Sequence, residues 1–245
     1  MSLFTGKTLI AAGIGGLLAM SLSAHAGVVL SSSRVIYGQT LHEKTIKATN
    51  RGSSPVLIQT WIDDGRENQT PDKLNLPFMV TPPVGRLDPG REQTIKITAL
   101  NTTFPLDRES VYWLSVLEIP AKSKASANAN TLQVALRTRI KLFWRPDHLA
   151  GSATEAAEHL QWQWSSENGK PALIANNTSP YYVSLSKAEV KSGAMQWTVT
   201  PKMIPPFGKE TLAVNSLKAT PGSAEIHYIA IGDLGNILDN NQKIK

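Results

Sequence analysis

The sequence predicts an all-β fold built from two β-sandwich domains. Short runs of alternating apolar and polar residues recur along the chain, and turns containing Gly, Pro or Asp separate them. No long segment repeats its apolar residues with a helical period. In Arg91–Leu100, for example, Ile95 and Ile97 fall on one face of the predicted strand. Short, closely spaced strands of this kind are typical of sandwiches rather than of α/β units.

The first 26 residues have the layout of an export signal. Lys7 provides the positive start, Leu9–Leu22 is apolar, and Ala24-His25-Ala26 is a small-x-small cleavage motif. The apolar stretch is shorter than the roughly 20 residues that a membrane helix needs, and no later stretch is as long, so we expect no membrane anchoring. Residues 1–26 are therefore expected to be a signal peptide that is removed on export.

Three runs define the first half of the mature chain. Val56–Ile62 is rich in β-forming residues and is closed by a turn at Asp63-Asp64-Gly65. Ser110–Ile119 is apolar on both faces, which is typical of a strand in the centre of a sheet. Leu132–Trp144 alternates again, with large aliphatic residues on one face.

A domain boundary is expected near residue 148. Pro146 ends the last of these strands, and the small residues at 149–157 are typical of a linker. We therefore assign residues 27–147 to an N-terminal domain and residues 148–245 to a C-terminal domain. The second domain contains predicted strands at 160–164, 170–175, 181–186, 210–214 and 225–231, with a short helical turn at 154–160.

Composition narrows the classes of partner. The chain has no cysteine, which excludes a disulfide scaffold, a thiol nucleophile and a thiolate metal site. A formal net charge of +6 suits nucleic acid, an anionic surface or an acidic group on a partner. Nucleic acid is the poorest of the three for an exported chain without a basic run interleaved with aromatic residues, so no nucleic-acid partner is expected.

The sequence shows no motif for catalysis or metal binding. It lacks a G-x-S-x-G turn, an H-E-x-x-H helix and a phosphate-binding Gly-rich loop. Asp63-Asp64-Gly65 with Glu67 does not have the oxygen spacing of a calcium loop, and a turn is the better interpretation. The mature chain's histidines have no second ligand at metal spacing: His42, His148, His159 and His227. We therefore expect a protein that is not an enzyme and needs no metal and no cofactor.

Two interpretations of Leu132–Trp144 stay open from its periodicity. It is an ordinary core strand with a solvated outer face, or it is an edge strand that offers its backbone and its apolar row to a partner. Proteins normally protect such an edge because it promotes aggregation. Its polar face carries Gln133, Arg137, Arg139 and Lys141.

Three stretches of the first half resemble the PapD-like periplasmic pilus chaperones. The segment from Asp107-Arg108-Glu109-Ser110 to Glu118-Ile119-Pro120 is similar to that family's sixth strand, and Leu132–Pro146 is similar to its seventh. Phe78–Pro83 with Arg86–Gly90 resembles its characteristic turn region. Weaker similarity in the second half lies at 177–182, 203–207 and 232–235. The resemblance thus covers essentially the whole mature chain.

The chain departs from some members of the family. Certain members carry a disulfide in the second domain, and this chain has no cysteine. The loop at 122–130 and the short strand that enters the cleft look like the short-loop subfamily, which serves rod-forming, adhesin-tipped pili. The loop is slightly longer than that pattern requires.

The resemblance implies two immunoglobulin-like sandwiches in an L-shaped arrangement, with a binding cleft between them. Members of the family work in the periplasm, where they bind nascent pilus subunits and deliver them to an outer-membrane usher. Each subunit lacks the last strand of its own sandwich, and the chaperone lends its seventh strand in donor-strand complementation. Whether the free protein caps this edge by forming a dimer stays open.

The resemblance also assigns residues to roles. The strand lent to the subunit would present Leu132, Val134 and Leu136. Arg34 and Lys141 would anchor the C-terminal carboxylate of the subunit. An ion network between the two domains would consist of Glu109, Arg145 and Asp233.

Two rival functions remain. A secreted carbohydrate-binding or adhesive sandwich would show an exposed aromatic platform, for which Trp162 with Trp164 is the candidate. These two residues lie two positions apart and so share one strand face, and we expect them to pack inside the second domain instead. An exported hydrolase is disfavoured because no nucleophile and base are placed together.

Overall fold

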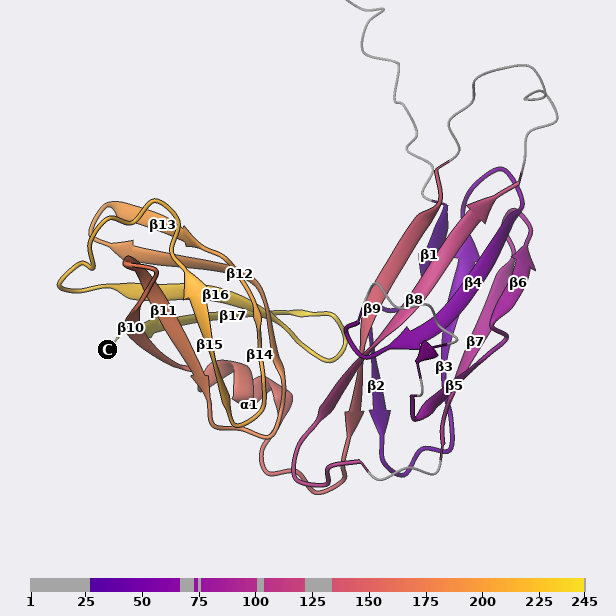
Figure 1. The fold of residues 1–245 in the computed structure, drawn as a ribbon, viewed down its shortest axis with the longest axis horizontal. Helices are drawn as coiled ribbons and strands as arrows, with labels where there is room; N and C mark the ends of the chain where they lie inside the picture. The colour runs from indigo at the N-terminus through magenta and orange to yellow at the C-terminus, as the bar shows by residue number, and fades with distance from the viewer. Residues whose placement is uncertain (1–26, 67–72, 75, 101–103, 122–133, 245) are drawn as a thin grey trace, which may run out of the picture.

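The computed structural model describes residues 27–66, 73–74, 76–100, 104–121 and 134–244 (Figure 1). The predicted signal peptide and the loop at 122–130 lie outside these ranges. The described chain forms two β-sandwiches whose long axes meet at an angle, which gives the expected L-shaped, all-β arrangement (Figure 1). Within the same ranges, no helix is long and apolar enough to cross a membrane.

The first sandwich packs a four-stranded sheet against a five-stranded one. The four-stranded sheet has the order β1 (Val28–Leu30), β3 (Lys44–Asn50), β7 (Glu92–Ala99) and β5 (Phe78–Thr81). The five-stranded sheet has the order β2 (Arg34–Gly38), β9 (Leu136–Arg145), β8 (Ser110–Pro120), β4 (Val56–Asp63) and β6 (Val84–Leu87). Strand β2 runs parallel to β9, whereas β8 and β4 pair antiparallel with their neighbours. The core between the sheets includes Ile95, Leu114 and Leu142, each fully buried.

The second sandwich has the same two-layer plan. One sheet has the order β10 (Gln161–Glu167), β11 (Lys170–Asn177) and β15 (Gly208–Ala213). The other has the order β13 (Met195–Val199), β12 (Val183–Ser192), β16 (Glu225–Ile231) and β17 (Ile237–Lys243), with β14 (Met203–Ile204) also paired to β12. Trp162 is buried in this core and Trp164 packs against it, so the pair forms no exposed aromatic platform.

A short helix joins the two sandwiches. Helix α1 (Ala153–Glu158) begins at Ser152, whose hydroxyl accepts a hydrogen bond from the backbone N–H of Glu155 at 3.2 Å, as is typical of an N-cap. Ala156 and Ala157 of this helix are buried in the second core. The predicted helical turn at 154–160 is thus confirmed, and the predicted domain boundary at residue 148 falls between the end of β9 and this helix.

Strand β9 begins later than the sequence predicts. It was expected over Leu132–Trp144 but spans Leu136–Arg145, with Val134 and Ala135 before it and Leu132 outside the described residues. Its neighbour β8 pairs Glu118 with Leu136 and then ends at Pro120. The last two residues of β8, Ile119 and Pro120, pair with β4 alone, so the paired part of β9 starts two residues before β8 ends.

Candidate binding site between the two domains

Strand β9 has a neighbour on both sides over only half of its length. Strand β2 pairs with Lys141–Arg145, beginning at the pair of Arg34 and Lys141. Strand β8 pairs with Leu136–Trp144 on the other side. Among the described residues, no strand pairs with Leu136–Ile140 on the β2 side. This open edge favours the interpretation of β9 as an edge strand over that of an ordinary core strand.

Apolar side chains are exposed at the start of this edge. Val134 is 57% exposed and Leu136 is 55% exposed, whereas Ile140 and Leu142 further along are buried in the core. Leu132, the third residue expected to be lent to a partner, lies outside the described residues. Unpaired backbone with exposed aliphatic side chains is a surface onto which another strand adds readily.

Two cations lie where β2 begins and the open edge of β9 stops. The Nη1 atom of Arg34 donates a hydrogen bond to the carbonyl oxygen of Ile231 at 2.7 Å. The Nζ atom of Lys141 donates to the hydroxyl of Ser184 at 2.9 Å. Both partners belong to the second sandwich, so this pair of cations lies in the angle between the two domains. The Arg34 guanidinium also lies 6.0 Å from the ring centroid of Phe143.

The two cations are partly buried and lie close enough together for the charge of one to act on the other. Burial, followed by the charge of Arg34, lowers the pKa of Lys141 to about 8. Burial also lowers the pKa of Arg34, although the negative charges of Asp233 and Glu109 oppose that effect. The Nε atom of Arg34 is buried and has no hydrogen-bond partner within the described structure. An incoming carboxylate would place a negative charge beside both cations and give the Arg34 Nε atom an acceptor.

The three residues expected to form an ion network lie in contact. Arg145 at the end of β9 donates from Nε to Oε1 of Glu109 at 2.7 Å, and from Nη1 and Nη2 to Asp233 at 2.6 and 2.8 Å. Glu109 is only 3% exposed, and its Oε2 accepts from the backbone N–H of Tyr182 at 2.8 Å. Burial raises the pKa of Glu109, while Arg145 and the Tyr182 N–H oppose that effect. Arg145 and Glu109 come from the first domain and Asp233 and Tyr182 from the second, so the network joins the two.

A further charged cluster, formed by Asp63 with two arginines of β9, was not predicted from the sequence. The predicted turn is present, because the backbone N–H of Gly65 donates to Oδ1 of Asp63 at 3.0 Å. However, Asp63 also pairs with Arg137 and Arg139 of β9, and its side chain is 1% exposed. The side chains of both arginines are therefore only partly exposed, at 30% and 19%. Two cations two residues apart on one strand face were the available signal for a shared carboxylate.

The described residues contain no group of three or more His, Cys, Asp or Glu side chains that could hold a metal ion. His227 lies on the surface of the second domain, where its Nε2 atom is 2.7 Å from Oδ1 of Asp239.

Comparison with known proteins gives two family matches that together cover most of the chain. Residues 27–150 match the family described as "Pili and flagellar-assembly chaperone, PapD N-terminal domain". Residues 155–242 match "Pili assembly chaperone PapD, C-terminal domain".

Curated proteins and solved structures agree with these matches. The "Probable fimbrial chaperone YadV" of Escherichia coli strain K12 is 42% identical over 93% of this chain and 94% of that protein. The "Chaperone protein FimB/FhaD" of Bordetella pertussis is 39% identical over 93% of this chain and 92% of that protein. The crystal structure of the YadV chaperone has a TM-score of 0.78 at 40% identity, covering 89% of this chain and 100% of that one. The Salmonella enterica SafA pilin in complex with the SafB chaperone has a TM-score of 0.72 at 25% identity, covering 89% and 96%.

The lowered pKa of Lys141 predicts how stability depends on pH. The folded protein releases this proton near pH 8, whereas the unfolded chain keeps it to about pH 10. Between these values the unfolded state binds more protons, so the free energy of unfolding contributed by this group rises with pH, by about 1 kcal/mol per pH unit. Urea unfolding of the protein and of the Lys141→Met variant between pH 7 and 10 should show this rise only in the former. Parallel pH profiles would contradict the assignment.

Proposed function

The chain belongs to the PapD family of pilus-assembly chaperones, and we propose that it works in the periplasm by lending β9 to nascent pilus subunits. The observation that carries this proposal is the open edge over Leu136–Ile140, with exposed aliphatic residues at one end and the pair of Arg34 and Lys141 at the other. Catalysis has no part in this function, because the protein acts by binding. The export signal at 1–26 delivers the chain to the periplasm, and an outer-membrane usher receives the loaded subunit.

The open edge can complete a subunit that lacks one strand. A strand of the subunit added along Leu136–Ile140 would form backbone hydrogen bonds with the unpaired side of β9. Val134 and Leu136 would then fill the subunit's exposed core, together with Leu132 from the preceding segment. Because Val134 and Leu136 are already about half buried, their further burial is worth roughly 1–2 kcal/mol each before ordering costs.

The two cations anchor the end of the added strand. Charge-assisted hydrogen bonds from Arg34 and Lys141 to a carboxylate are worth about 1.5–3 kcal/mol each. The C-terminal carboxylate of the subunit would replace the contacts to Ile231 and Ser184 and would give the Arg34 Nε atom an acceptor.

The position of this anchor fixes both direction and register. The subunit strand would end where β2 begins and would therefore run parallel to β9, as β2 does. A slip of one residue would turn the inserted side chains outward, so a fixed chain end is needed to select the correct pairing.

The ion network holds the two domains at the angle that forms the site. Arg145 connects Glu109 of the first domain with Asp233 of the second, four residues along β9 from Lys141. Loss of this connection would separate Arg34 and Lys141 from Ile231 and Ser184 across the cleft.

Removing either anchoring cation should weaken subunit binding. Arg34→Ala and Lys141→Ala should each lower the affinity for the pilus subunit encoded beside the chaperone gene by roughly 10- to 100-fold, because each loses a charge-assisted hydrogen bond. Co-purification from the periplasm followed by a titration measures this loss. Lys47→Ala is a matched control, because Lys47 is an exposed cation in the other sheet. Unchanged binding in both anchor variants would contradict the carboxylate anchor, and glycan binding without subunit binding would contradict the proposed function.

Breaking the interdomain network should loosen the angle between the domains. In Asp233→Asn, spin labels placed one on each domain should show a broader distance distribution by electron resonance, because Arg145 loses its charged partner in the second domain. Asp239→Asn serves as the control, since Asp239 is an exposed aspartate that contacts His227 within the same domain. Identical distributions in the two variants would show that Asp233 does not set the angle.

A further inference from the structure

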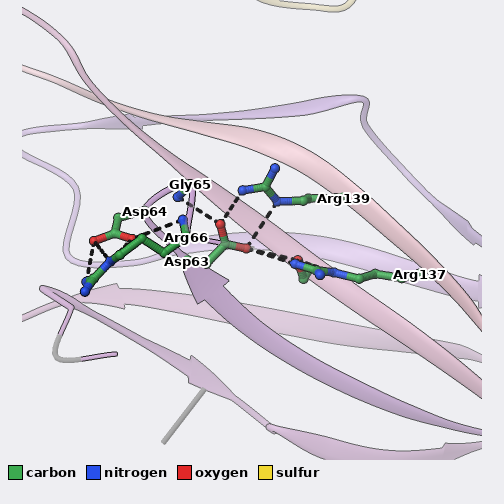
Figure 2. Close-up of polar contacts among 7 residues, drawn as sticks. Asp63, Asp64, Gly65, Arg66, Arg137 and Arg139 are labelled. Atoms are coloured by element: carbon green, nitrogen blue, oxygen red, sulfur yellow. Dashed lines mark hydrogen bonds and ion pairs between the residues drawn. The ribbon is translucent and has the colours of Figure 1, made fainter. Parts of the chain in front are cut away.

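A buried carboxylate on β4 contacts β9 across the intervening strand β8. Asp63, the last residue of β4, accepts hydrogen bonds on Oδ2 from Arg137 Nη2 and from Arg139 Nε, both at 3.2 Å (Figure 2). Its Oδ1 accepts from Arg139 Nη2 and from the backbone N–H of Gly65. The hydroxyl of Ser115, on the intervening strand β8, donates to Oδ2 at 3.3 Å. One carboxylate thus ties together the outer faces of β4, β8 and β9.

Aromatic rings hold the two arginines in place. The guanidinium of Arg137 lies 5.0 Å from the ring centroid of Trp61, and that of Arg139 lies 4.6 Å from that of Trp113. Arg137 also donates from Nε and Nη2 to the Ser115 hydroxyl at 3.1 and 2.9 Å. The planar guanidinium groups therefore have little freedom to move away from the carboxylate.

The carboxylate is ionised in spite of its burial. Burial by itself raises the pKa of Asp63. Hydrogen bonds from Arg139, Gly65 and Ser115, together with the charge of Arg139, lower the pKa by more than burial raises it, so the net pKa lies below its usual range. Removing one member of such a cluster leaves the remaining charges desolvated and without a partner.

This cluster lies near the first residue of β9, the strand proposed to bind the partner. Arg137 and Arg139 face Leu117 and Ser115 of β8, directly after the exposed Leu136. Over this part, β8 is the neighbour of β9 within the described structure, and the other edge is open. A shift of β9 by one residue would turn both arginines away from Asp63 and leave its charge buried and unpaired.

We propose that Asp63 is a positioning residue for the strand lent to the subunit: with Arg137 and Arg139 it locks the register and order of the first half of β9 before a subunit arrives. The inference rests on the proposed function, since it assigns Asp63 a role in presenting that strand. A strand that is already ordered and in register loses less conformational entropy when a partner adds to it. Without the lock, the half of β9 that has a single neighbour should detach from β8 locally.

The adjacent aspartate offers a matched control. Asp64 pairs with Arg66 two residues away, and their side chains are 28% and 51% exposed (Figure 2). An exposed pair of this kind contributes little to stability, and within the described residues its ion pair and side-chain hydrogen bonds run between Asp64 and Arg66 themselves. A second control is Ile95→Ala in β7, which destabilises the first domain from the opposite sheet.

The test combines hydrogen exchange with subunit capture. In Asp63→Asn, those amides of residues 136–140 that are hydrogen-bonded to β8 should exchange roughly 10-fold faster than in the parent, while the amides of residues 141–144, paired on both sides, should change less. Capture of the pilus subunit encoded beside the chaperone gene should weaken roughly 10-fold, because part of the binding energy goes into ordering the strand. Asp64→Asn should match the parent in both measurements. Arg137→Gln, which leaves the Asp63–Arg139 pair in place, should show a smaller change in the same direction.

Three outcomes would separate the inference from the function on which it rests. Parental exchange and capture in both Asp63→Asn and Arg137→Gln would overturn the register lock. The inference would also be overturned if Ile95→Ala, with the same loss of thermal stability as Asp63→Asn, weakened capture by the same amount. The effect would then be general destabilisation of the first domain. Failure of the parent protein to capture the subunit would contradict the proposed function, and the exchange measurement would still decide whether Asp63 orders β9.

Discussion

The structure depends on one unequal arrangement: β9 has a neighbour on each side over its second half and on one side over its first half. This follows from where β2 begins, because Arg34 is the first residue of that strand and pairs with Lys141. The doubly paired half buries Leu142 and Trp144 in the first core and has a neighbour on each side, as an interior strand does. The singly paired half keeps an unpaired edge, which a folded protein tolerates only when something protects or uses it.

Charges along the outer face of β9 connect its two halves to the rest of the molecule. Arg137 and Arg139 contact Asp63 in the same sheet, Lys141 lies beside Arg34 and contacts Ser184, and Arg145 contacts Glu109 and Asp233. Alternation along a strand places these four cations on one face, opposite the aliphatic residues that enter the core. The partners change along the strand from the first domain alone to both domains. The same strand therefore presents its open edge, contributes to the cleft and joins the domains.

Much of the fold follows from sequence periodicity, and the exceptions have physical reasons. Alternating or continuously apolar runs identified β4, β7 and β8, since each buries at least one face. Strand β17 (Ile237–Lys243) was missed because it is a polar strand on the outside of its sheet, without a buried row. The open edge of β9 could not be predicted from its own residues, because it depends on where β2 starts.

The site was predicted unevenly for the same reason. The resemblance to pilus chaperones supplied Arg34 with Lys141, and Glu109 with Arg145 and Asp233, as groups, whereas composition and spacing alone would have left each as a surface charge. Asp63 escaped notice because its arginine partners lie 74 and 76 residues away, and only the register of β4, β8 and β9 brings them together.

Thiol protection tests most directly the claim that β9 completes a pilus subunit. The chain has no cysteine, so a single cysteine introduced as Leu136→Cys, or as Met195→Cys on the exposed strand β13, provides the sole reactive thiol. If β9 completes the subunit, binding should make the thiol at position 136 inaccessible to a maleimide reagent while that at position 195 stays reactive. A bound subunit that leaves position 136 as reactive as in the free protein would show that β9 is not the strand that completes it.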